Sequence, residues 1–523
     1  MAEAIRKLPI GVQSFEVMRQ EQFLYVDKTR YIYELAHTGR QYFLSRPRRF
    51  GKSLFLSTLK AYWQGRKELF EGLEIAELEK DSEGAFEPYP VFYFDFNGQD
   101  YQAAALEDVL DGMLSDWEKI YGCEKGGLLS DRFKRLLEAA REKTGKKCVV
   151  LVDEYDKPLL EVLENDELEE HNKAVFKGFF GTLKTYDEHL RFVFITGVTK
   201  FSKVSIFSDL NQLQDISMFE EYSGICGMTG EEICANFQPE LQAMAAKRKM
   251  SEEKCLQKLA RKYDGYHFFP GCQGVYNPFS VLNALSKKGF SDFWFSTGTP
   301  TFLVRRLKNM HFDVRQFAEN TIYADAVNLS DYRADNPDIV PLLYQTGYLT
   351  IVGADSEEGP YILGFPNEEV RLGFLKSLFP EYAPTAVTGS GKDIFALRSH
   401  ILAGDTEELK ETFAALFASI PYTTKDAPFE HYFQTVVYLV FTLLGQYVHA
   451  EVHSSRGRAD CVLETDKFVY IFEFKVDKSA REALEQIEEK GYAAPYGADE
   501  RQLFKIGVNF DSESRSLSEW LVG

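Results

Sequence analysis

The most informative segment of this chain reads Arg46-Pro47-Arg48-Arg49-Phe50-Gly51-Lys52-Ser53. It lies between a short apolar run at residues 42–44 and an amphipathic run at residues 54–63. A strand, a tight loop that carries Gly-Lys-Ser and a helix are together typical of loops that cradle phosphate groups. The N–H groups at the start of such a helix point at the anion, and the helix dipole favours negative charge there.

The last three residues of the loop each have a predicted role in binding phosphate. Gly51 lets the chain approach an anion without a Cβ in the way, Lys52 reaches the outer phosphates, and the Ser53 hydroxyl binds Mg²⁺. Arg46 stands where a glycine begins the usual G-x-x-x-x-G-K-S motif. The alternative is a basic surface turn, which is common for an R-P-R-R cluster. We expect the nucleotide to be held by Arg48, Arg49, Phe50, Gly51, Lys52 and Ser53.

A second segment, Cys148-Val149-Val150-Leu151-Val152-Asp153-Glu154, is an apolar run that ends in two carboxylates. An uninterrupted apolar run of this length indicates a strand buried on both faces, as in a parallel sheet. At its carboxyl end we expect Asp153 to bind Mg²⁺ and Glu154 to polarise the attacking water. The alternative is an ordinary strand that happens to end in acids, but the Gly-Lys-Ser loop favours the functional interpretation.

Residues 91–96 and 191–196 predict two further strands of the same sheet. The second ends in Thr196, and Thr199 follows shortly after; both are candidates for sensing the γ-phosphate or the attacking water. Helical stretches separate the four strands, which predicts a three-layer α/β domain of the P-loop NTPase type with right-handed crossovers. Ligands of such sheets bind at the carboxyl ends of the strands, where these motifs converge.

Four segments resemble the bacterial AAA-ATPase-like proteins: residues 9–15, 25–29, 46–53 and 205–211. In that family the arginine-rich loop without its first glycine is the usual form, so Arg46 does not argue against nucleotide binding. The resemblance covers nearly the whole chain and implies ATP rather than GTP. The segment at 25–29 either lines the adenine pocket or begins a helix capped by Asp27 or Thr29.

The composition limits the classes of function. A chain of 523 residues predicts about two to four domains, and seven scattered cysteines without a C-x-x-C pair predict reduced thiols in a cytoplasm and no zinc site. A net charge of −20 disfavours a protein that coats nucleic acid non-specifically. Polar residues interrupt the apolar stretch at 432–448, which therefore predicts a buried helix and no membrane span.

The middle of the chain predicts a mostly helical segment at 230–310, followed by a helix and hairpin between residues 341 and 365. The segments at 263–268 and 275–280 also resemble the AAA-ATPase-like family, and their Asp264-Gly265 and Asn277-Pro278 dipeptides favour structural turns. The helix and hairpin suggest a winged-helix-like unit. The turn at 353–359 is acidic, so we expect this unit to serve as a mechanical coupler and not to contact DNA.

A linker at 384–392 leads into a last domain, in which two strands are predicted at 458–463 and 468–475. Glu473 and Lys475 are two residues apart on the second strand and so share a face, and hairpin pairing brings Asp460 within roughly 5–8 Å of them. A bare E-x-K motif is usually a charge pair between strands. Here the strand is apolar, so its charged residues would be partly buried, and buried charges need a reason.

Asp460 followed by Glu473-Phe474-Lys475 resembles the PD-(D/E)XK nuclease superfamily, with Ala459 in place of its proline. The resemblance implies that Asp460 and Glu473 bind Mg²⁺ and that Lys475 positions the attacking hydroxide or stabilises the developing charge. Glu430 matches that family's additional helix carboxylate, or is a helix-terminal acid that interacts with the dipole. Additional candidates for the site are Gln486, Lys490 and Tyr492.

The sequence thus predicts an α/β multidomain protein: a P-loop domain at 1–229, a helical and winged-helix-like region at 230–383, and a restriction-endonuclease-like α/β domain at 393–523. The predicted function is ATP binding and hydrolysis that control a Mg²⁺-dependent nuclease. The alternative is an ATP-driven switch whose silent C-terminal domain binds nucleic acid or a protein. The expected partners are nucleic acid, DNA in preference to RNA, and further copies of the chain in a homo-oligomer.

Overall fold

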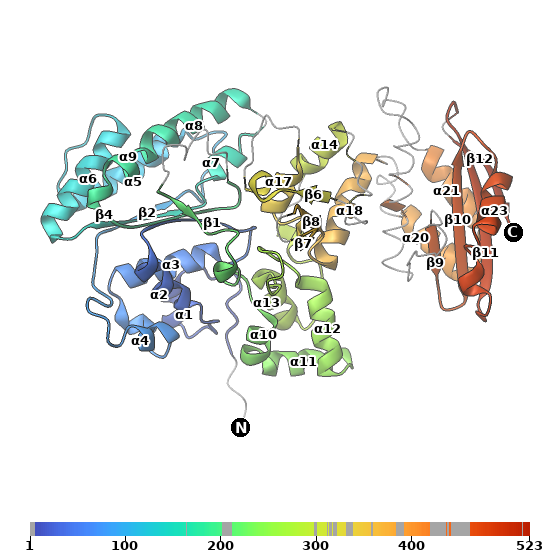
Figure 1. Cartoon of the computed structure of the whole chain (residues 1–523), viewed down its shortest axis with the longest axis horizontal. Coiled ribbons are helices and arrows are strands. Elements are labelled where there is room, and N and C mark those ends of the chain that lie inside the picture. The colour runs from blue at the N-terminus through green and yellow to red at the C-terminus, as the bar shows by residue number, and fades with distance from the viewer. Residues whose placement is uncertain are drawn as a thin grey trace. The chain divides into compact units, whose positions relative to one another are not determined.

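The computed structural model of the chain is drawn in Figure 1. It describes residues 6–163, 165–200, 212–297, 301–310, 312, 316, 322–330, 338–356, 359–382, 392–418, 436, 439–440, 461–514 and 516–523. The chain forms two compact units. The first comprises Met1–Thr297 and Asn320–Glu369, and the second comprises Gly298–Glu319 and Val370–Gly523.

A parallel five-stranded sheet in the order β2-β3-β4-β1-β5 forms the centre of the first unit. The predicted strand positions are confirmed, and β4 lies between β1 and β3. Leu44 at the end of β1 pairs with Thr196 of β4, and Val152 near the end of β3 pairs with Ile195. The end of β4 therefore separates the phosphate loop from the acidic strand. The strands are β1 (Gln41–Ser45), β2 (Val91–Asp95), β3 (Cys148–Asp153), β4 (Leu190–Gly197) and β5 (Gln214–Asp215).

Helices cover both faces of this sheet, so the three-layer prediction is confirmed (Figure 1). Every residue of β3 is buried, as its uninterrupted apolar sequence predicts. On one face lie α1 (Phe15–Gln20), α2 (Thr29–Thr38), α3 (Lys52–Trp63) and α4 (Glu74–Leu78). On the other lie α5 (Leu106–Tyr121), α6 (Leu129–Thr144), α8 (Asp166–Phe180) and α9 (Thr182–Thr185), and α7 (Lys157–Leu160) follows β3.

Four helices follow the sheet and enclose their own apolar core, which includes Phe237, Leu259 and Tyr263. They are α10 (Gly230–Asn236), α11 (Gln238–Arg248), α12 (Glu252–Tyr263) and α13 (Pro278–Lys287). A small antiparallel sheet in the order β6-β8-β7 comes next, with the helix and hairpin that the sequence predicts. Its elements are β6 (Ile322–Ala324), α16 (Ala326–Leu329), α17 (Val340–Gln345), β7 (Thr350–Ala354) and β8 (Tyr361–Gly364).

The second unit contains a four-stranded mixed sheet in the order β12-β11-β10-β9. Helix α23 packs against β10 and β11, and α21 packs against β12 on the opposite face (Figure 1). The ring of Phe413 on α21 contacts Phe472 and Trp520 on that face. The elements are α14 (Thr301–Asn309), α18 (Glu368–Tyr382), α20 (Lys392–Ala403), α21 (Thr406–Ala418), β9 (Cys461–Glu464), β10 (Phe468–Val476), α23 (Ala480–Glu489), β11 (Gln502–Asp511) and β12 (Ser516–Val522).

The predicted turn at 465–467 joins β9 and β10 in an antiparallel hairpin, in which Phe472 pairs with Cys461. The predicted linker up to residue 391 and most of the apolar stretch at 432–448 lie outside the described residues. Among the helices that are described, none has the length and apolar character needed to cross a lipid bilayer.

Candidate nucleotide and nuclease sites

The phosphate loop turns into α3 at Gly51, whose φ of 92° lies in the left-handed region. A glycine adopts this conformation at no steric cost, whereas a side chain would strain it. A Cβ added at Gly51 would meet no atom within 4 Å, so the space in front of the helix start is open. The first N–H groups of α3 face no preceding turn of helix, which makes this end of the helix suited to an anion.

The Lys52 side chain is 5% exposed and lies back over the loop. Its ammonium group donates hydrogen bonds to the carbonyl oxygens of Arg46 at 2.9 Å and Pro47 at 3.1 Å. These contacts place the cation inside the curve of the loop.

Ser53, Asp153 and Thr196 converge from α3, β3 and β4 at the carboxyl edge of the sheet. Asp153 is 1% exposed and interacts with the Ser53 hydroxyl, and Tyr93 of β2 donates a hydrogen bond to its Oδ2 at 3.4 Å. Asp153 Oδ1 and Thr196 Oγ1 are buried and have no hydrogen-bond partner among the described residues. Because buried polar atoms are normally paired, these two oxygens fit a site that binds a hydrated cation and phosphate.

Burial raises the pKa of Asp153 to about 6, because desolvation and the nearby charge of Glu154 outweigh the opposing effects of the Ser53 hydroxyl and the Lys52 ammonium. An unfolded aspartate ionises near pH 4. Between these values the unfolded carboxyl loses its proton first, so this group destabilises the nucleotide-free fold increasingly as the pH rises from about 4 to 6. A shift of about two pH units corresponds to about 3 kcal/mol.

We therefore predict that Asp153→Asn raises the unfolding temperature of the nucleotide-free protein at pH 7.5 and has little effect at pH 4. The reason is that the amide carries no charge to desolvate. Thermal unfolding at both pH values measures this, and Asp81→Asn, which neutralises an exposed carboxylate of the same unit, is the control. An equal effect of Asp153→Asn at both pH values would contradict the assigned burial of charge.

Glu154, the predicted polarising group, follows Asp153 at a φ of 48°. This left-handed conformation is uncommon for a residue with a side chain and is found preferentially at functional sites. The side chain is half-buried, and it forms no hydrogen bond or ion pair with the described residues. Its carboxylate is close enough to raise the pKa of Asp153. It is therefore placed beside the cluster and remains available to water.

Arg46, which replaces the first glycine of the motif, is a structural anchor in this fold. Its side chain is 1% exposed, and its guanidinium donates to the carbonyl oxygens of Ser217 at 2.7 Å and Tyr222 at 2.9 Å. The guanidinium also lies 3.8 Å from the ring centroid of Phe268. The arginine thus fixes the start of the loop to segments that follow β5 and α12.

We predict that Arg46→Gly, which restores the usual motif, lowers stability. The two carbonyls would lose their buried donor, at about 1–3 kcal/mol each, so we expect a loss of about 2–6 kcal/mol in chemical denaturation. The control is Arg49→Gly, because Arg49 is exposed at a φ of 68° that glycine adopts without strain. A destabilisation by Arg49→Gly as large as that by Arg46→Gly would refute the anchor role.

The other residues predicted to bind nucleotide differ in their burial. Phe50 is 1% exposed, and its ring packs edge-on against Tyr266. Its side chain is therefore part of the core, and only its backbone can face a bound nucleotide. Arg48 and Arg49 are exposed. The Arg48 carbonyl accepts a hydrogen bond from Trp294 Nε1 at 3.2 Å, and the Arg49 guanidinium lies over the Phe279 ring.

The two threonines at the end of β4 and just after it differ in their partners. Thr199 Oγ1 donates to Asp156 Oδ2 at 2.7 Å, and the N–H of Thr199 donates to the same oxygen at 2.6 Å. The hydroxyl of Thr199 is therefore occupied, and of the two candidates Thr196 is the one with a free oxygen in the cluster. Asp156 was missed by sequence reasoning, although its position shortly after the acidic strand is a signal that could have suggested it.

For the segment at 25–29 the predicted N-cap is wrong: Lys28 holds that position of α2 without a capping side-chain hydrogen bond, and Thr29 is the first helical residue. Asp27 Oδ1 accepts the Thr29 N–H at 2.8 Å, and Asp27 Oδ2 accepts the Glu74 N–H at 2.7 Å, so one carboxylate holds the first turns of α2 and α4. The fourth segment of the family resemblance, 205–211, lies outside the described residues.

In the second unit, β10 presents alternate residues to α23. Val469 and Ile471 are fully buried against that helix, and Glu473 and Lys475 continue the same face. Glu473 is 2% exposed. The Lys475 ammonium donates to Glu473 Oε1 at 2.9 Å and to Gln486 Oε1 at 2.7 Å, and Gln486 Nε2 donates to Glu473 Oε1.

Gln486 therefore joins the predicted pair, whereas two other candidates do not. Tyr492 is 4% exposed and packs in the apolar cluster under α23, so its predicted place in the site is wrong. Lys490 follows the last turn of α23, is exposed, and forms no hydrogen bond or ion pair with Glu473 or Gln486. Asp460 and Glu430 lie outside the described residues. In the part of the chain that is described, no group of three His, Cys, Asp or Glu side chains is arranged to hold a metal ion.

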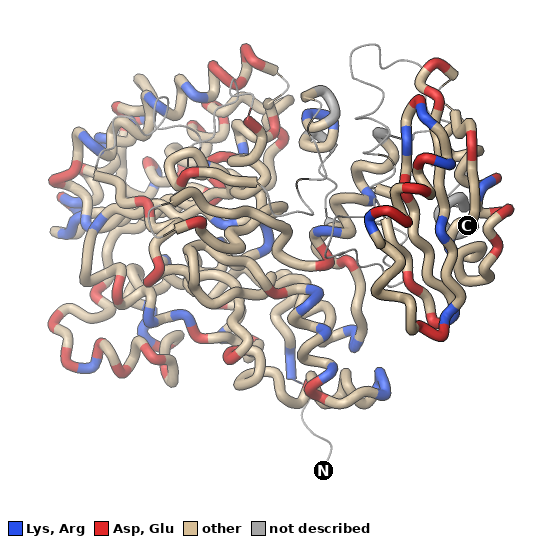
Figure 2. The backbone as a smooth tube through the Cα atoms, turned by 45° about the vertical axis from the view of Figure 1, so that its right-hand side comes forward, with Lys and Arg blue, Asp and Glu red and all other residues tan. Residues whose placement is uncertain are grey.

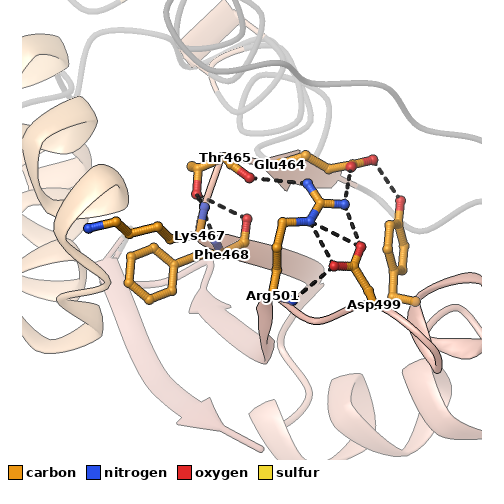
Figure 3. A network of polar contacts seen from close by, with 7 residues as sticks. Glu464, Thr465, Lys467, Phe468, Asp499 and Arg501 are labelled. Carbon is orange, nitrogen blue, oxygen red and sulfur yellow. Dashed lines mark hydrogen bonds and ion pairs between the residues drawn. The ribbon is translucent and has the colours of Figure 1, made fainter.

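A polar network stabilises the opposite end of the hairpin (Figure 3). Arg501 donates to Glu464 Oε2 at 2.7 Å, to both Asp499 oxygens and to the Thr465 carbonyl at 3.1 Å. Hydrogen bonds from Arg501 lower the pKa of Asp499 to about 2. Each acidic member has a basic partner in this network, so it holds the β9–β10 turn to β11 and offers no vacant ligand.

Comparison with known proteins gives one family match over each of the two segments that contain the candidate sites. Residues 9–207 match the protein family described as a predicted AAA-ATPase, and residues 428–520 match the PD-(D/E)XK nuclease superfamily. The chain is also 36% identical, over 535 residues, to an uncharacterized protein in the vnfD 5′ region of Azotobacter chroococcum mcd 1. That similarity covers 99% of this chain and 99% of the relative. The first matched segment contains the Lys52 loop, and the second contains Glu473.

Proposed function

This chain belongs to the family of AAA-ATPase-like proteins that carry a C-terminal PD-(D/E)XK nuclease superfamily domain, and we propose that its nucleotide state controls a Mg²⁺-dependent nuclease. The ATPase-like and nuclease-like halves are the shared architecture of the family. The control of one by the other, and phosphodiester cleavage itself, are the proposal.

The observation that carries the proposal is the assembly of Lys52, Ser53, Asp153 and Thr196 from separate elements around two unpartnered buried oxygens. A bound Mg²⁺–ATP would supply the phosphoanhydride bond and the cation that neutralises Asp153. In this proposal Ser53 and Asp153 hold the cation and Lys52 contacts the outer phosphates. Glu154 accepts a proton from the attacking water, and Thr196 binds the γ-phosphate or that water.

In the nuclease half, Glu473 is proposed to bind Mg²⁺ together with Asp460 and Glu430. Lys475 is proposed to position the attacking hydroxide or to stabilise the charge that develops on the phosphate. Gln486 contacts both Glu473 and Lys475, so it fixes their separation. A buried carboxylate and a lysine held in this way are pre-organised for chemistry, since little reorientation is needed when substrate binds.

The alternative function is an ATP-driven switch whose nuclease-like domain only binds nucleic acid or a protein. Its support is the net charge of −20, and acidic and basic residues are interspersed along the described chain and form no long basic stretch (Figure 2). The Glu473–Lys475–Gln486 contacts favour the nuclease, because a module that only binds has no need for a buried carboxylate paired with a lysine. We propose DNA in preference to RNA as the substrate, a cytoplasmic location, and self-association into a homo-oligomer.

The test is cleavage of single- and double-stranded DNA and RNA by the purified full-length protein, with Mg²⁺ or Mn²⁺, in the presence and absence of ATP. We expect metal-dependent cleavage whose rate changes with ATP. Cleavage that is identical with and without ATP would refute control by nucleotide. If every substrate remains intact while ATP still binds, the switch is the correct function.

A further inference from the structure

A buried series of hydrogen bonds leads from the nucleotide site to α17. Asp156 accepts the N–H groups of Val198 at 3.0 Å and Thr199 at 2.6 Å. The next residue, Lys200, donates its N–H to Oε1 of Gln345 at 2.8 Å. Gln345 ends α17, is 5% exposed, and donates from Nε2 to the Leu329 carbonyl at 2.7 Å. One side-chain amide thus joins the loop after β4 to α17 and to the end of α16.

The loop that Gln345 holds follows directly after β4, whose next-to-last residue is Thr196, the residue whose free hydroxyl lies in the nucleotide cluster. The Thr196 carbonyl accepts the Tyr155 N–H at 3.1 Å. Gly197 leaves no spare room, because a Cβ there would lie 2.5 Å from Asp156 Oδ1. Hydrogen bonds and close packing therefore restrain successive residues from Thr196 to Lys200. A shift of Thr196 toward a bound phosphate would have to move the Lys200 N–H as well.

The turn after α17 contacts the other side of the nucleotide site. Gly347 has a φ of 87°, and a Cβ added to it would lie 2.6 Å from Cβ of Pro47 in the phosphate loop. In addition, the Trp294 ring, whose Nε1 donates to the Arg48 carbonyl, packs against the Tyr348 ring at 5.2 Å. The segment from α17 to Tyr348 is thus in contact with the loop after β4 through Gln345 and with the phosphate loop through Gly347.

A small cavity of about 20 Å³ lies beside this linkage. The residues that line it include Arg46, Pro47, Lys200, Asp215, Tyr344 and Gln345. Lys200 forms an ion pair with Asp215 in its wall. Packed protein interiors move between discrete arrangements, and a void of this kind gives side chains space to change position.

From these contacts we infer that Gln345 is a positioning residue that transmits the nucleotide state of the P-loop site to α17 and its hairpin. The inference rests on the proposed ATP-binding function and adds the route of its regulation. A role confined to stability is the competing explanation, because Gln345 is a buried amide with two hydrogen bonds. The two explanations differ in whether the response of α17 to nucleotide depends on Gln345.

The experiment compares the full-length protein with Gln345→Met, which keeps the length of the side chain and removes both hydrogen bonds. The control is Asn283→Leu on α13, since Asn283 is also 5% exposed and donates a single part-buried hydrogen bond to the Phe279 carbonyl at 2.8 Å. Three quantities are measured: affinity for a fluorescent ATP analogue with Mg²⁺, unfolding temperature, and backbone hydrogen exchange of residues 338–347 with and without ATP.

In the wild-type protein and the Asn283→Leu control, we expect nucleotide to slow exchange of residues 338–347 at least fivefold. In Gln345→Met we expect affinity within threefold of wild type and a change in exchange below twofold. A wild-type response in Gln345→Met would overturn the inference, and so would nucleotide binding that leaves these residues unaffected in the wild-type protein. Failure of the wild-type protein to bind the analogue would refute the proposed function and this inference together.

Discussion

Replacing Lys52 with alanine is expected to weaken ATP binding at least 100-fold, which corresponds to a loss of about 3 kcal/mol. The ammonium group lies inside the curve of the loop, where it contacts the Arg46 and Pro47 carbonyls. A phosphate placed there would receive charge-assisted hydrogen bonds, which are roughly twice as strong as neutral ones. Isothermal titration with ATP and Mg²⁺ measures the change, and Lys67→Ala, an exposed lysine of the same domain, is the control.

Two results would separate a lost contact from a damaged loop. The ammonium of Lys52 also holds the loop carbonyls, so the unfolding temperature of Lys52→Ala must be compared with that of the wild-type protein. Ser53→Ala removes only a hydroxyl at the half-buried next position, and we expect it to weaken binding in Mg²⁺ more than binding without metal. If Lys52→Ala binds ATP as tightly as the wild-type protein, the phosphate-loop assignment is wrong.

Local sequence was sufficient to predict the central sheet and the convergence of Ser53 and Asp153 at its carboxyl edge. The phosphate loop is bounded by an apolar strand and an amphipathic helix, and β3 is a continuous apolar run, so neither depends on distant residues for its type. The placement of Asp153 then followed from the rule that functional side chains gather at the carboxyl ends of parallel strands. Asp153 lies beside the Ser53 hydroxyl.

Distant contacts determined what the sequence could not predict. Arg46 is an anchor because Ser217 and Tyr222, far along the chain, present their carbonyls to it. Thr196 and Thr199 are equivalent in sequence terms, and only the position of Asp156 shows which hydroxyl is occupied. In the nuclease-like unit, Gln486 lies on α23 and faces β10, whereas Tyr492 follows that helix and packs beneath it. The chain turns after the end of α23 at Glu489, and this turn directs Tyr492 into the apolar cluster and not toward Glu473.

The sequence predicts that residues 263–268 form a structural turn. The side chains of this turn contact residues of the phosphate loop. Tyr266 packs edge-on against Phe50, and the Arg46 guanidinium lies over the ring of Phe268. The motif therefore supports two residues of the phosphate loop. The N–H of His267 donates a hydrogen bond to Oγ1 of Thr350, the first residue of β7, at 2.7 Å. This turn motif therefore supports the proposed nucleotide site, although none of its residues is a predicted ligand.

Replacing Glu473 with alanine is expected to reduce Mg²⁺-dependent cleavage at least about 1,000-fold, because it removes a carboxylate proposed to hold the ion that stabilises the transition state. The same change leaves Lys475 without its buried partner, and removal of one member of a buried pair commonly costs about 3–5 kcal/mol. Glu473→Gln is therefore the companion variant. Its amide keeps the shape of the side chain and an oxygen that accepts from Lys475, but it is a poor ligand for Mg²⁺.

The control for both variants is Glu485→Gln, which neutralises an exposed carboxylate next to Gln486 on α23. Cleavage and circular dichroism are measured together, with Mg²⁺ and with Mn²⁺. Loss of cleavage in Glu473→Gln with an unchanged spectrum assigns the chemistry to this carboxylate, because the fold and the lysine contact are both retained. Cleavage that persists in both Glu473 variants eliminates the site. Activity that survives in Glu473→Gln but not in Glu473→Ala shows that Glu473 acts by positioning Lys475. In that case the hydrogen bond to Lys475 is required and the negative charge is not.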